Sequence, residues 1–215
     1  MAPRSLANVL GDFQRSLRES SRLANDAYRW SQPLQPGVRP QISQKRRHAI
    51  TELAFLTSFL AWEIFLEHSF ILYLMGKGAP RGPAPVRYAF PPSLSAAIDW
   101  VAEGKEYAQW TSPPHVRGRA ERFFRNGRPF AVALRSNQNV LEEAQIIRNA
   151  IAHKSANAQK KVERIVRARM GGVLPPNITT GKFLGTTVPG SAPPISFLDF
   201  YLERLESCAV QIVPS

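Results

Sequence analysis

The sequence predicts an all-α protein built as a bundle of about five main helices. Apolar residues recur at three- to four-residue steps through several long segments, and prolines and glycines gather between those segments. No alternating pattern indicates a series of strands. The 215 residues are enough for one sizeable core and short for two. We therefore expect an N-terminal helix with a proline-rich connector over residues 1–40 and one helical domain over residues 41–215.

The first two expected helices are long. Apolar residues at helical spacing cover residues 4–31, and the prolines and glycine within residues 33–40 must end that helix. The second helix is expected over residues 43–75, where Gly76 and Gly78 follow as stop signals.

The second helix is apolar on nearly all sides over residues 53–66. A surface helix needs only one apolar stripe, so this one should be covered on two sides. In a small domain a second copy of the chain could provide the other cover, which predicts a homodimer. Glu63, Glu67 and His68 interrupt the apolar stretch, so we expect a buried core helix and no membrane span.

The middle of the chain predicts shorter elements. Residues 77–92 are rich in proline, glycine and arginine and should form a loop. A short helix is expected over residues 92–103, capped by Ser93 or Ser95. A proline pair makes residues 105–116 look irregular.

The rest of the chain is expected to be mostly helical. Residues 117–126 predict a short basic helix. Residues 130–170 predict a long helical block, which is either one helix interrupted near residues 153–156 or two helices in sequence. Residues 173–193 predict a loop that is long for a compact domain, and such loops are often functional or mobile. A last amphipathic helix should cover residues 194–212.

Composition indicates an anionic partner. The net charge is +12 and arginine dominates the excess, which suits RNA, DNA or another polyanion, although a basic solvated surface would give the same count. Cys208 is the single cysteine, so no disulfide can form within the chain and a reducing, cytoplasmic location is expected. We expect Cys208 to be a small core residue.

The chain lacks the motifs of several enzyme classes. The chain has no Walker-type phosphate loop, no GxGxxG before a helix and no Gly-x-Ser-x-Gly elbow. Its four histidines and one cysteine show no zinc-ligand spacing, and its acidic residues are too scattered for a two-metal nuclease. We therefore expect neither a metal nor a cofactor.

One segment carries a specific signature. Residues 145–154 read Gln-Ile-Ile-Arg-Asn-Ala-Ile-Ala-His-Lys, in which Arg148 is followed by Asn149 and, after a gap of four residues, by His153. This segment resembles the HEPN family, whose members carry an Arg, four to six residues and a His, often with Asn after the Arg. The resemblance is strongest over residues 130–170 and looser over residues 43–212.

The resemblance implies an all-helical, homodimeric, metal-independent endoribonuclease of toxin–antitoxin or phage-defence type. It implies RNA as the substrate and Arg148, Asn149 and His153 as the catalytic set. It also implies a separate antitoxin or defence-complex partner.

Helical geometry adds a physical interpretation of this set. Asn149 and His153 are i, i+4 neighbours on one face, whereas Arg148 lies about 140° from His153 around the axis. A second protomer could therefore bring its Arg148 to the His153 of the first. His153 would act as base or acid in attack by the ribose 2′-OH, leaving a 2′,3′-cyclic phosphate. Arg148 would neutralise phosphoryl charge, and Asn149 would hold His153 or contact phosphate.

Supporting residues are also expected. Glu63 could pair with Arg148 or another arginine, or it could lie on an exposed edge. Lys154 could contact phosphate. Two basic runs could follow an RNA backbone or could simply be solvated helix faces. They are Lys160, Lys161, Arg164, Arg167 and Arg169, and Arg119, Arg122, Arg125 and Arg128.

Two other functions remain open at this point. A non-catalytic HEPN-like subunit could bind RNA or nucleotide, or serve as a scaffold in a defence complex. A helical DNA-binding regulator would need a helix-turn-helix with a short glycine-containing turn, and no segment convincingly predicts one.

Overall fold

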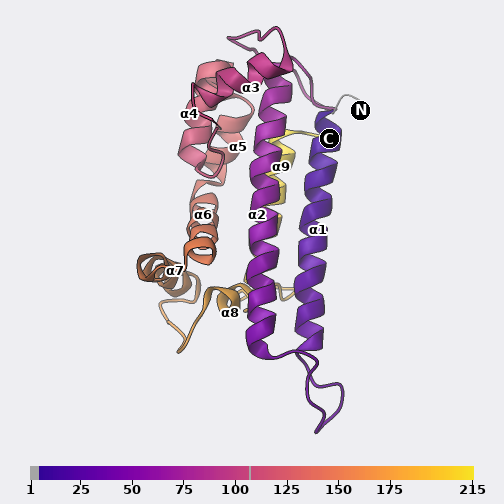
Figure 1. Cartoon of the computed structure of the whole chain (residues 1–215), viewed down its shortest axis with the longest axis vertical. Coiled ribbons are helices and arrows are strands. Elements are labelled where there is room, and N and C mark those ends of the chain that lie inside the picture. The colour runs from indigo at the N-terminus through magenta and orange to yellow at the C-terminus, as the bar shows by residue number, and fades with distance from the viewer. Residues whose placement is uncertain (1–4, 107) are drawn as a thin grey trace. The chain divides into compact units, whose positions relative to one another are not determined.

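The protein is all-α. The computed structural model describes residues 5–106 and 108–215, which form nine α-helices, one short 3-10 helix and no strand (Figure 1). The helices are α1 (Leu6–Trp30), α2 (Gln44–Leu74), α3 (Leu94–Ala102), α4 (Pro113–Phe123), η1 (Arg125–Gly127), α5 (Phe130–Ser136), α6 (Gln138–His153), α7 (Ala156–Arg169), α8 (Thr180–Leu184) and α9 (Phe197–Ile212). The predicted all-α class is confirmed, whereas the HEPN-like layout and the dimer stay predictions.

Contacts divide the chain into two compact units that share its long helices. The first unit contains the described residues up to Arg15, together with Ala61–Glu142 and Arg204–Ser215. The second contains Ser16–Leu60 and Glu143–Glu203. The boundary that the sequence suggested after residue 40 stays a prediction.

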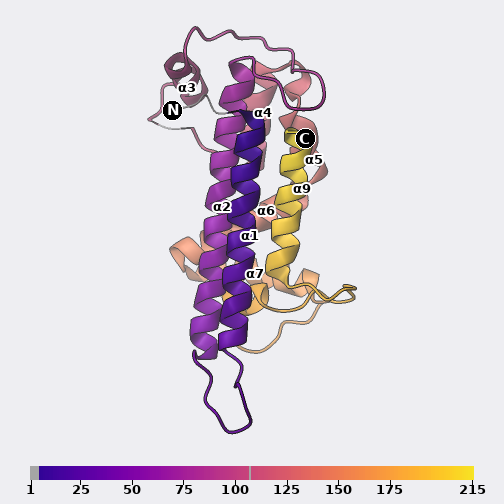
Figure 2. The same ribbon diagram turned by 90° about the vertical axis from the view of Figure 1, so that its right-hand side faces the viewer.

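In each unit a part of α1 packs antiparallel to a part of α2 (Figures 1 and 2). In the first unit the ring of Phe13 lies 5.1 Å from that of Phe65 and 5.8 Å from that of Trp62. In the second unit α1 meets α9, where the Ser21 hydroxyl donates a 2.8 Å hydrogen bond to Asp199. Aromatic packing therefore joins α1 to α2 in the first unit, and a polar contact joins α1 to α9 in the second.

The long helix α2 buries one side and exposes another. Large aromatic residues along it are fully buried, including Phe55, Phe59 and Phe70. Leu53, Leu60 and Ile64 are 54%, 54% and 44% exposed and fall on one side of the helix. The chain itself thus covers only part of the apolar surface that the sequence predicted to be covered.

Helix α2 ends where the sequence predicted. Gly76 takes a φ of +81°, and the amide of Lys77 donates a 2.9 Å hydrogen bond to the carbonyl of Leu72. This glycine-based C-cap satisfies carbonyls that the last turn leaves free. Among the described residues α2 is also the one helix long and apolar enough to span a membrane, with a mean hydropathy of 1.5, although a core helix passes the same test.

The segment before α4 departs from the sequence-based expectation. Residues 105–116 were expected to be irregular throughout, but Pro113 and Pro114 begin α4. Proline is well suited to the first turn of a helix, because its missing amide would lack a helical partner there anyway. The serine cap of α3 is Ser93, whose hydroxyl accepts from the amide of Ala96.

The remaining helices follow the expected block with two additional features. The block over residues 130–170 breaks at Lys154 and Ser155, as predicted, and also at Asn137. The expected loop over residues 173–193 contains the short helix α8, whose N-cap Thr179 accepts from the amide of Lys182. Cys208 is a buried core residue of α9, and burial raises its pKa to about 12.

Candidate functional site

The residues that resemble the HEPN signature lie at the junction of α6 and α7. His153 is the last residue of α6, and Lys154 follows it with a left-handed φ of 45°. Ser155 then takes an extended conformation, and its hydroxyl caps α7 by accepting from the amide of Ala158 at 3.2 Å. Serine favours this cap because its oxygen satisfies an amide of the first helical turn. The imidazole is therefore attached just before the amino end of another helix.

A small hollow opens at this junction. It has a volume of about 230 Å³, and its polar lining residues come from both helices and from the N-cap between them: Asn149, His153, Ser155, Asn157 and Lys161. Asn149 and His153 therefore face one space, as their i, i+4 spacing predicted. His153 is exposed and Asn149 is half-buried.

Arg148 does not line this hollow. It is half-buried, and its Nη1 donates a long hydrogen bond of 3.4 Å to Oδ1 of Asn149. This agrees with the angular separation of about 140° between positions 148 and 153 on a helix. Within one chain, Arg148 contacts the neighbour of His153 in the hollow but does not share the hollow with it.

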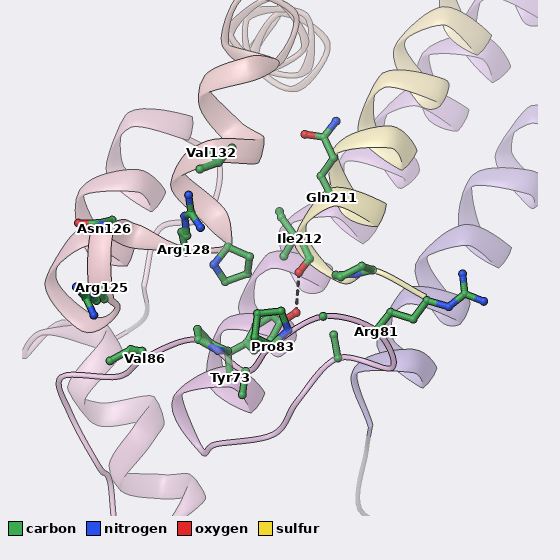
Figure 3. A pocket seen from close by; sticks show the side chains of 16 residues that line it. Tyr73, Arg81, Pro83, Val86, Arg125, Asn126, Arg128, Val132, Gln211 and Ile212 are labelled. Carbon is green, nitrogen blue, oxygen red and sulfur yellow. Dashed lines mark hydrogen bonds between the residues drawn. The ribbon is translucent and has the colours of Figure 1, made fainter.

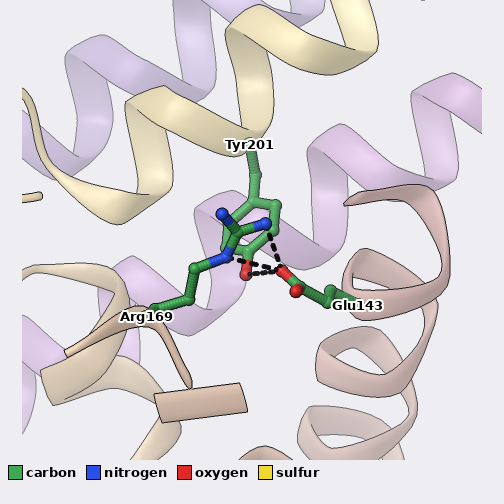
Figure 4. A network of polar contacts seen from close by, with 3 residues as sticks. All are labelled: Glu143, Arg169 and Tyr201. Carbon is green, nitrogen blue, oxygen red and sulfur yellow. Dashed lines mark hydrogen bonds and ion pairs between the residues drawn. The ribbon is translucent and has the colours of Figure 1, made fainter. Parts of the chain in front are cut away.

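A polar network that the sequence analysis missed joins α6, α7 and α9. Figure 4 shows Glu143, Arg169 and Tyr201 converging from these three helices. Arg169 donates two hydrogen bonds to Oε2 of Glu143, at 3.0 and 2.9 Å, and the Tyr201 hydroxyl donates a third at 2.8 Å. The network ties the two helices that form the hollow to each other and to α9. Glu143 and Arg169 lie 26 residues apart, and no local pattern signals such a pair.

Burial and charge set the ionisation of this network. Burial, reinforced by the negative charge and hydrogen bond of Glu143, raises the pKa of Tyr201 well above its ordinary value. Burial opposes the charge of Arg169, but the hydrogen bond and charge of Glu143 outweigh it and raise the pKa of the guanidinium. Near neutral pH the phenol of Tyr201 is therefore neutral and the guanidinium of Arg169 is charged.

Most of the basic run on α7 is presented on the surface. Lys160, Lys161, Arg164 and Arg167 are all exposed, whereas Arg169, expected in the same run, is half-buried and bound to Glu143. Lys160, Arg164 and Arg167 follow i, i+4, i+7 spacing and form one stripe, and Lys161 lies beside it and lines the hollow. A polyanion could follow this stripe into the hollow.

The second basic run does not form one surface. Arg119 was expected among the RNA-binding residues, but it is 7% exposed, lies 4.7 Å from the ring centre of Trp110 and donates to the carbonyl of Gln109. Arg122 forms an ion pair with Glu103 at 2.7 Å, and Arg125 is exposed and lines a groove in the first unit. Position 119 faces inward because it shares a helical face with the buried Val116 and Ala120.

The two supporting residues, Glu63 and Lys154, lie in different parts of the structure. Glu63 is half-buried on α2 in the first unit, whereas Arg148 belongs to the second, so their pairing stays a prediction. Lys154 is exposed at the junction itself. Its proposed contact with phosphate also stays a prediction.

Residues 5–106 and 108–215 contain no group of three or more His, Cys, Asp or Glu side chains that could hold a metal ion. No protein-family profile matches the chain, and comparisons with characterised proteins and with solved structures also gave no match. The resemblance to HEPN proteins therefore rests on residues 145–154 and on the helical layout around them.

Proposed function

We propose that the protein is a metal-independent endoribonuclease of HEPN type, acting as a homodimer in a toxin–antitoxin or phage-defence setting. The observation that carries the proposal is the hollow that Asn149 and His153 share with Lys161. It combines a group able to transfer protons, an amide to orient it and a cation to hold phosphate.

The chemistry requires few groups. A base removes the proton of the ribose 2′-OH, the oxygen forms a bond to the neighbouring phosphorus, and the bond to the 5′ oxygen breaks as an acid protonates it. His153 serves as base or acid, and Asn149 orients it. The amino end of α7 and Lys161 favour the phosphate on electrostatic grounds. The products are a 2′,3′-cyclic phosphate and a 5′-hydroxyl.

A second copy of the chain would complete the site. Arg148 is absent from the hollow of its own chain, so the guanidinium that neutralises phosphoryl charge would come from the partner. The exposed stripe of Leu53, Leu60 and Ile64 on α2 offers apolar surface for such a dimer.

One observation favours a second candidate, an RNA-binding HEPN-like subunit that does not cleave. In a single chain the hollow has His153 and Lys161 but no arginine. If the chain acts alone, it retains the basic stripe of α7 for RNA binding and lacks the full catalytic set.

Cleavage of total RNA in EDTA, compared between the wild type and His153→Ala, tests the proposal. Losing an acid–base group costs about 10²- to 10⁴-fold in rate, so we expect cleavage to disappear with helical content unchanged. His115→Ala is the matched control, because His115 is exposed on α4 and does not line the hollow. Equal cleavage by all three proteins, or cleavage of a substrate with hydrogen in place of the 2′-OH, contradicts the mechanism. RNA binding without cleavage in the wild type supports the second candidate.

Dimerisation has its own test. Leu60→Glu places a charge in the middle of the exposed stripe, so sedimentation should show a monomer and cleavage should be lost with it. Leu34→Glu is the control, because Leu34 is 75% exposed in the loop after α1. A wild-type protein that sediments as a monomer while cleaving RNA contradicts the shared site.

A further inference from the structure

A second cavity, larger than the hollow, lies wholly within the first unit (Figure 3). Its volume is about 630 Å³, within the range typical of ligand pockets. The loop after α2, the segment from η1 to α5 and the end of α9 form its walls. We call it the arginine groove, after Arg81, Arg125 and Arg128 among its lining residues.

Hydrogen bonds hold the walls of the arginine groove in place. The amide of Arg81 donates to the carbonyl of Pro214 at 3.1 Å, and the amide of Arg125 donates to that of Val86 at 2.9 Å. Beneath the loop, the Tyr73 hydroxyl donates a 2.6 Å hydrogen bond to the carbonyl of Ile212, as the dashed line in Figure 3 shows. A ligand would therefore meet a groove that is already formed, which lowers the entropic cost of binding.

The charge of the groove has one sign. Arg81, Arg125 and Arg128 are exposed, and none of them forms an ion pair with a residue in the described part of the chain. The sixteen residues that line the groove include no Asp or Glu. Three guanidinium groups without compensating carboxylates favour an anion, and the planar fork of arginine matches a carboxylate bidentately.

The remaining lining is mostly aliphatic and prolyl. It includes Pro83, Val86, Pro129 and Val132, with Val132 52% exposed. Tyr73 is the single aromatic residue among the lining residues, and it is only 2% exposed. Single-stranded nucleic acid binds by stacking its bases on accessible aromatic rings. An apolar amino-acid side chain needs no such ring and fits an aliphatic surface.

We infer that the arginine groove binds an acidic peptide segment of a partner protein, with carboxylates on the arginines and apolar side chains against the prolines and Val132. The partner class follows from charge complementarity between the groove and the segment. The inference does not depend on RNA cleavage, because the groove and the hollow belong to different units and have no residue in common.

Fluorescence anisotropy with a defined probe tests this inference on the full chain. The probe is a fluorescein-labelled peptide of Glu-Gly-Leu repeats, and the matched peptides replace Glu by Gln or Leu by Gly. Replacing Arg81, Arg125 and Arg128 together by Gln should weaken binding of the probe at least tenfold. The control replaces Arg18, Arg22 and Arg39 by Gln, which removes the same charge from exposed positions that do not line the groove, and should change affinity less than twofold.

Further variants and peptides distinguish binding of a peptide from binding of any anion. Val132→Asp, at an exposed position of the groove, should weaken the probe severalfold and leave helical content unchanged. The Gln and Gly peptides should both bind less tightly than the probe. Equal weakening by the two triple variants overturns the inference, because it shows attraction to net charge alone. Displacement of the probe by poly(U), with loss of poly(U) binding in the groove variant, overturns it in favour of nucleic acid.

Discussion

Helices α4 and α7 each turn one arginine inward and leave others in solvent, but the two inward arginines are compensated differently. Arg169 lies 5.0 Å from the ring centre of Phe200 and donates two hydrogen bonds to Glu143. Arg119 lies over Trp110 and donates to a backbone carbonyl, while its Nε is buried without a hydrogen-bond partner.

The difference shows what a carboxylate adds to a buried cation. A ring, a carbonyl and the charges of Glu103 and Glu67, which accept no hydrogen bond from Arg119, offset only part of the cost of removing its guanidinium from water, so burial lowers the pKa of Arg119. Where a carboxylate accepts hydrogen bonds directly, the cation is favoured and the pKa of Arg169 rises. Arg169 therefore acts as a tie between helices, whereas Arg119 acts mainly as packing.

The largest expected effect comes from breaking the tie. Arg169→Met keeps the apolar stem but leaves Glu143 partly buried without its cation. Removing one partner of a buried pair costs about 3–5 kcal/mol, and the 29% and 20% exposure of these two side chains reduces our expectation to about 2 kcal/mol. Urea unfolding at pH 7 measures this loss. Adding Glu143→Gln should restore part of it, and a single variant as stable as the wild type would show that the ion pair does not tie the helices.

The sequence could predict those parts of the structure that depend on local signals. Caps, prolines and glycines gave the helix ends, and i, i+4 spacing placed Asn149 and His153 in one hollow. The inward turn of Arg119 and Arg169 was missed because each depends on contacts between elements, with Trp110 in the first case and Glu143 and Tyr201 in the second. The arginine groove was missed for the same reason, since its walls come from three distant segments.

The second prediction concerns the exposed basic side chains of α7. Replacing Lys160, Lys161 and Arg164 together by Gln should weaken RNA binding about tenfold or more at physiological salt. The slope of log K against log salt should fall by about 2, since each phosphate contact on a single strand contributes about 0.7. Filter binding over a salt series measures both quantities.

A control triple sharpens this prediction. Replacing Arg18, Arg22 and Arg39 by Gln removes the same charge from exposed positions outside α7. An identical change of slope in both triples would mean that RNA responds to total charge and not to the stripe on α7.

Alkaline pH tests the phenol of the Arg169 network. The pKa of Tyr201 is raised in the folded protein, so its contribution to stability is complete below its ordinary value of about 10 and is lost as pH rises above it. The free energy of unfolding should therefore decline above that pH, and Tyr201→Phe should remove up to about 1.4 kcal/mol per pH unit of the decline. Urea unfolding from pH 9 to 11 measures it. Tyr28→Phe, at a residue 54% exposed, is the control and should leave the slope unchanged.

The smallest expected effect is at the other inward arginine. Arg119→Met keeps much of the stem volume over Trp110 and removes a buried Nε that has no hydrogen-bond partner. Apolar replacement of a poorly compensated buried charge is often close to neutral, so stability should change by less than about 1 kcal/mol. RNA binding should also be unchanged, because the guanidinium is not on the surface. Arg122→Met is the surface control, since its ion pair with Glu103 is 59% exposed on the arginine side and such pairs contribute about 0–1 kcal/mol. A loss at Arg119 as large as that at Arg169 would mean that the ring and the carbonyl compensate a buried cation as well as a carboxylate does, and the contrast between α4 and α7 would not hold.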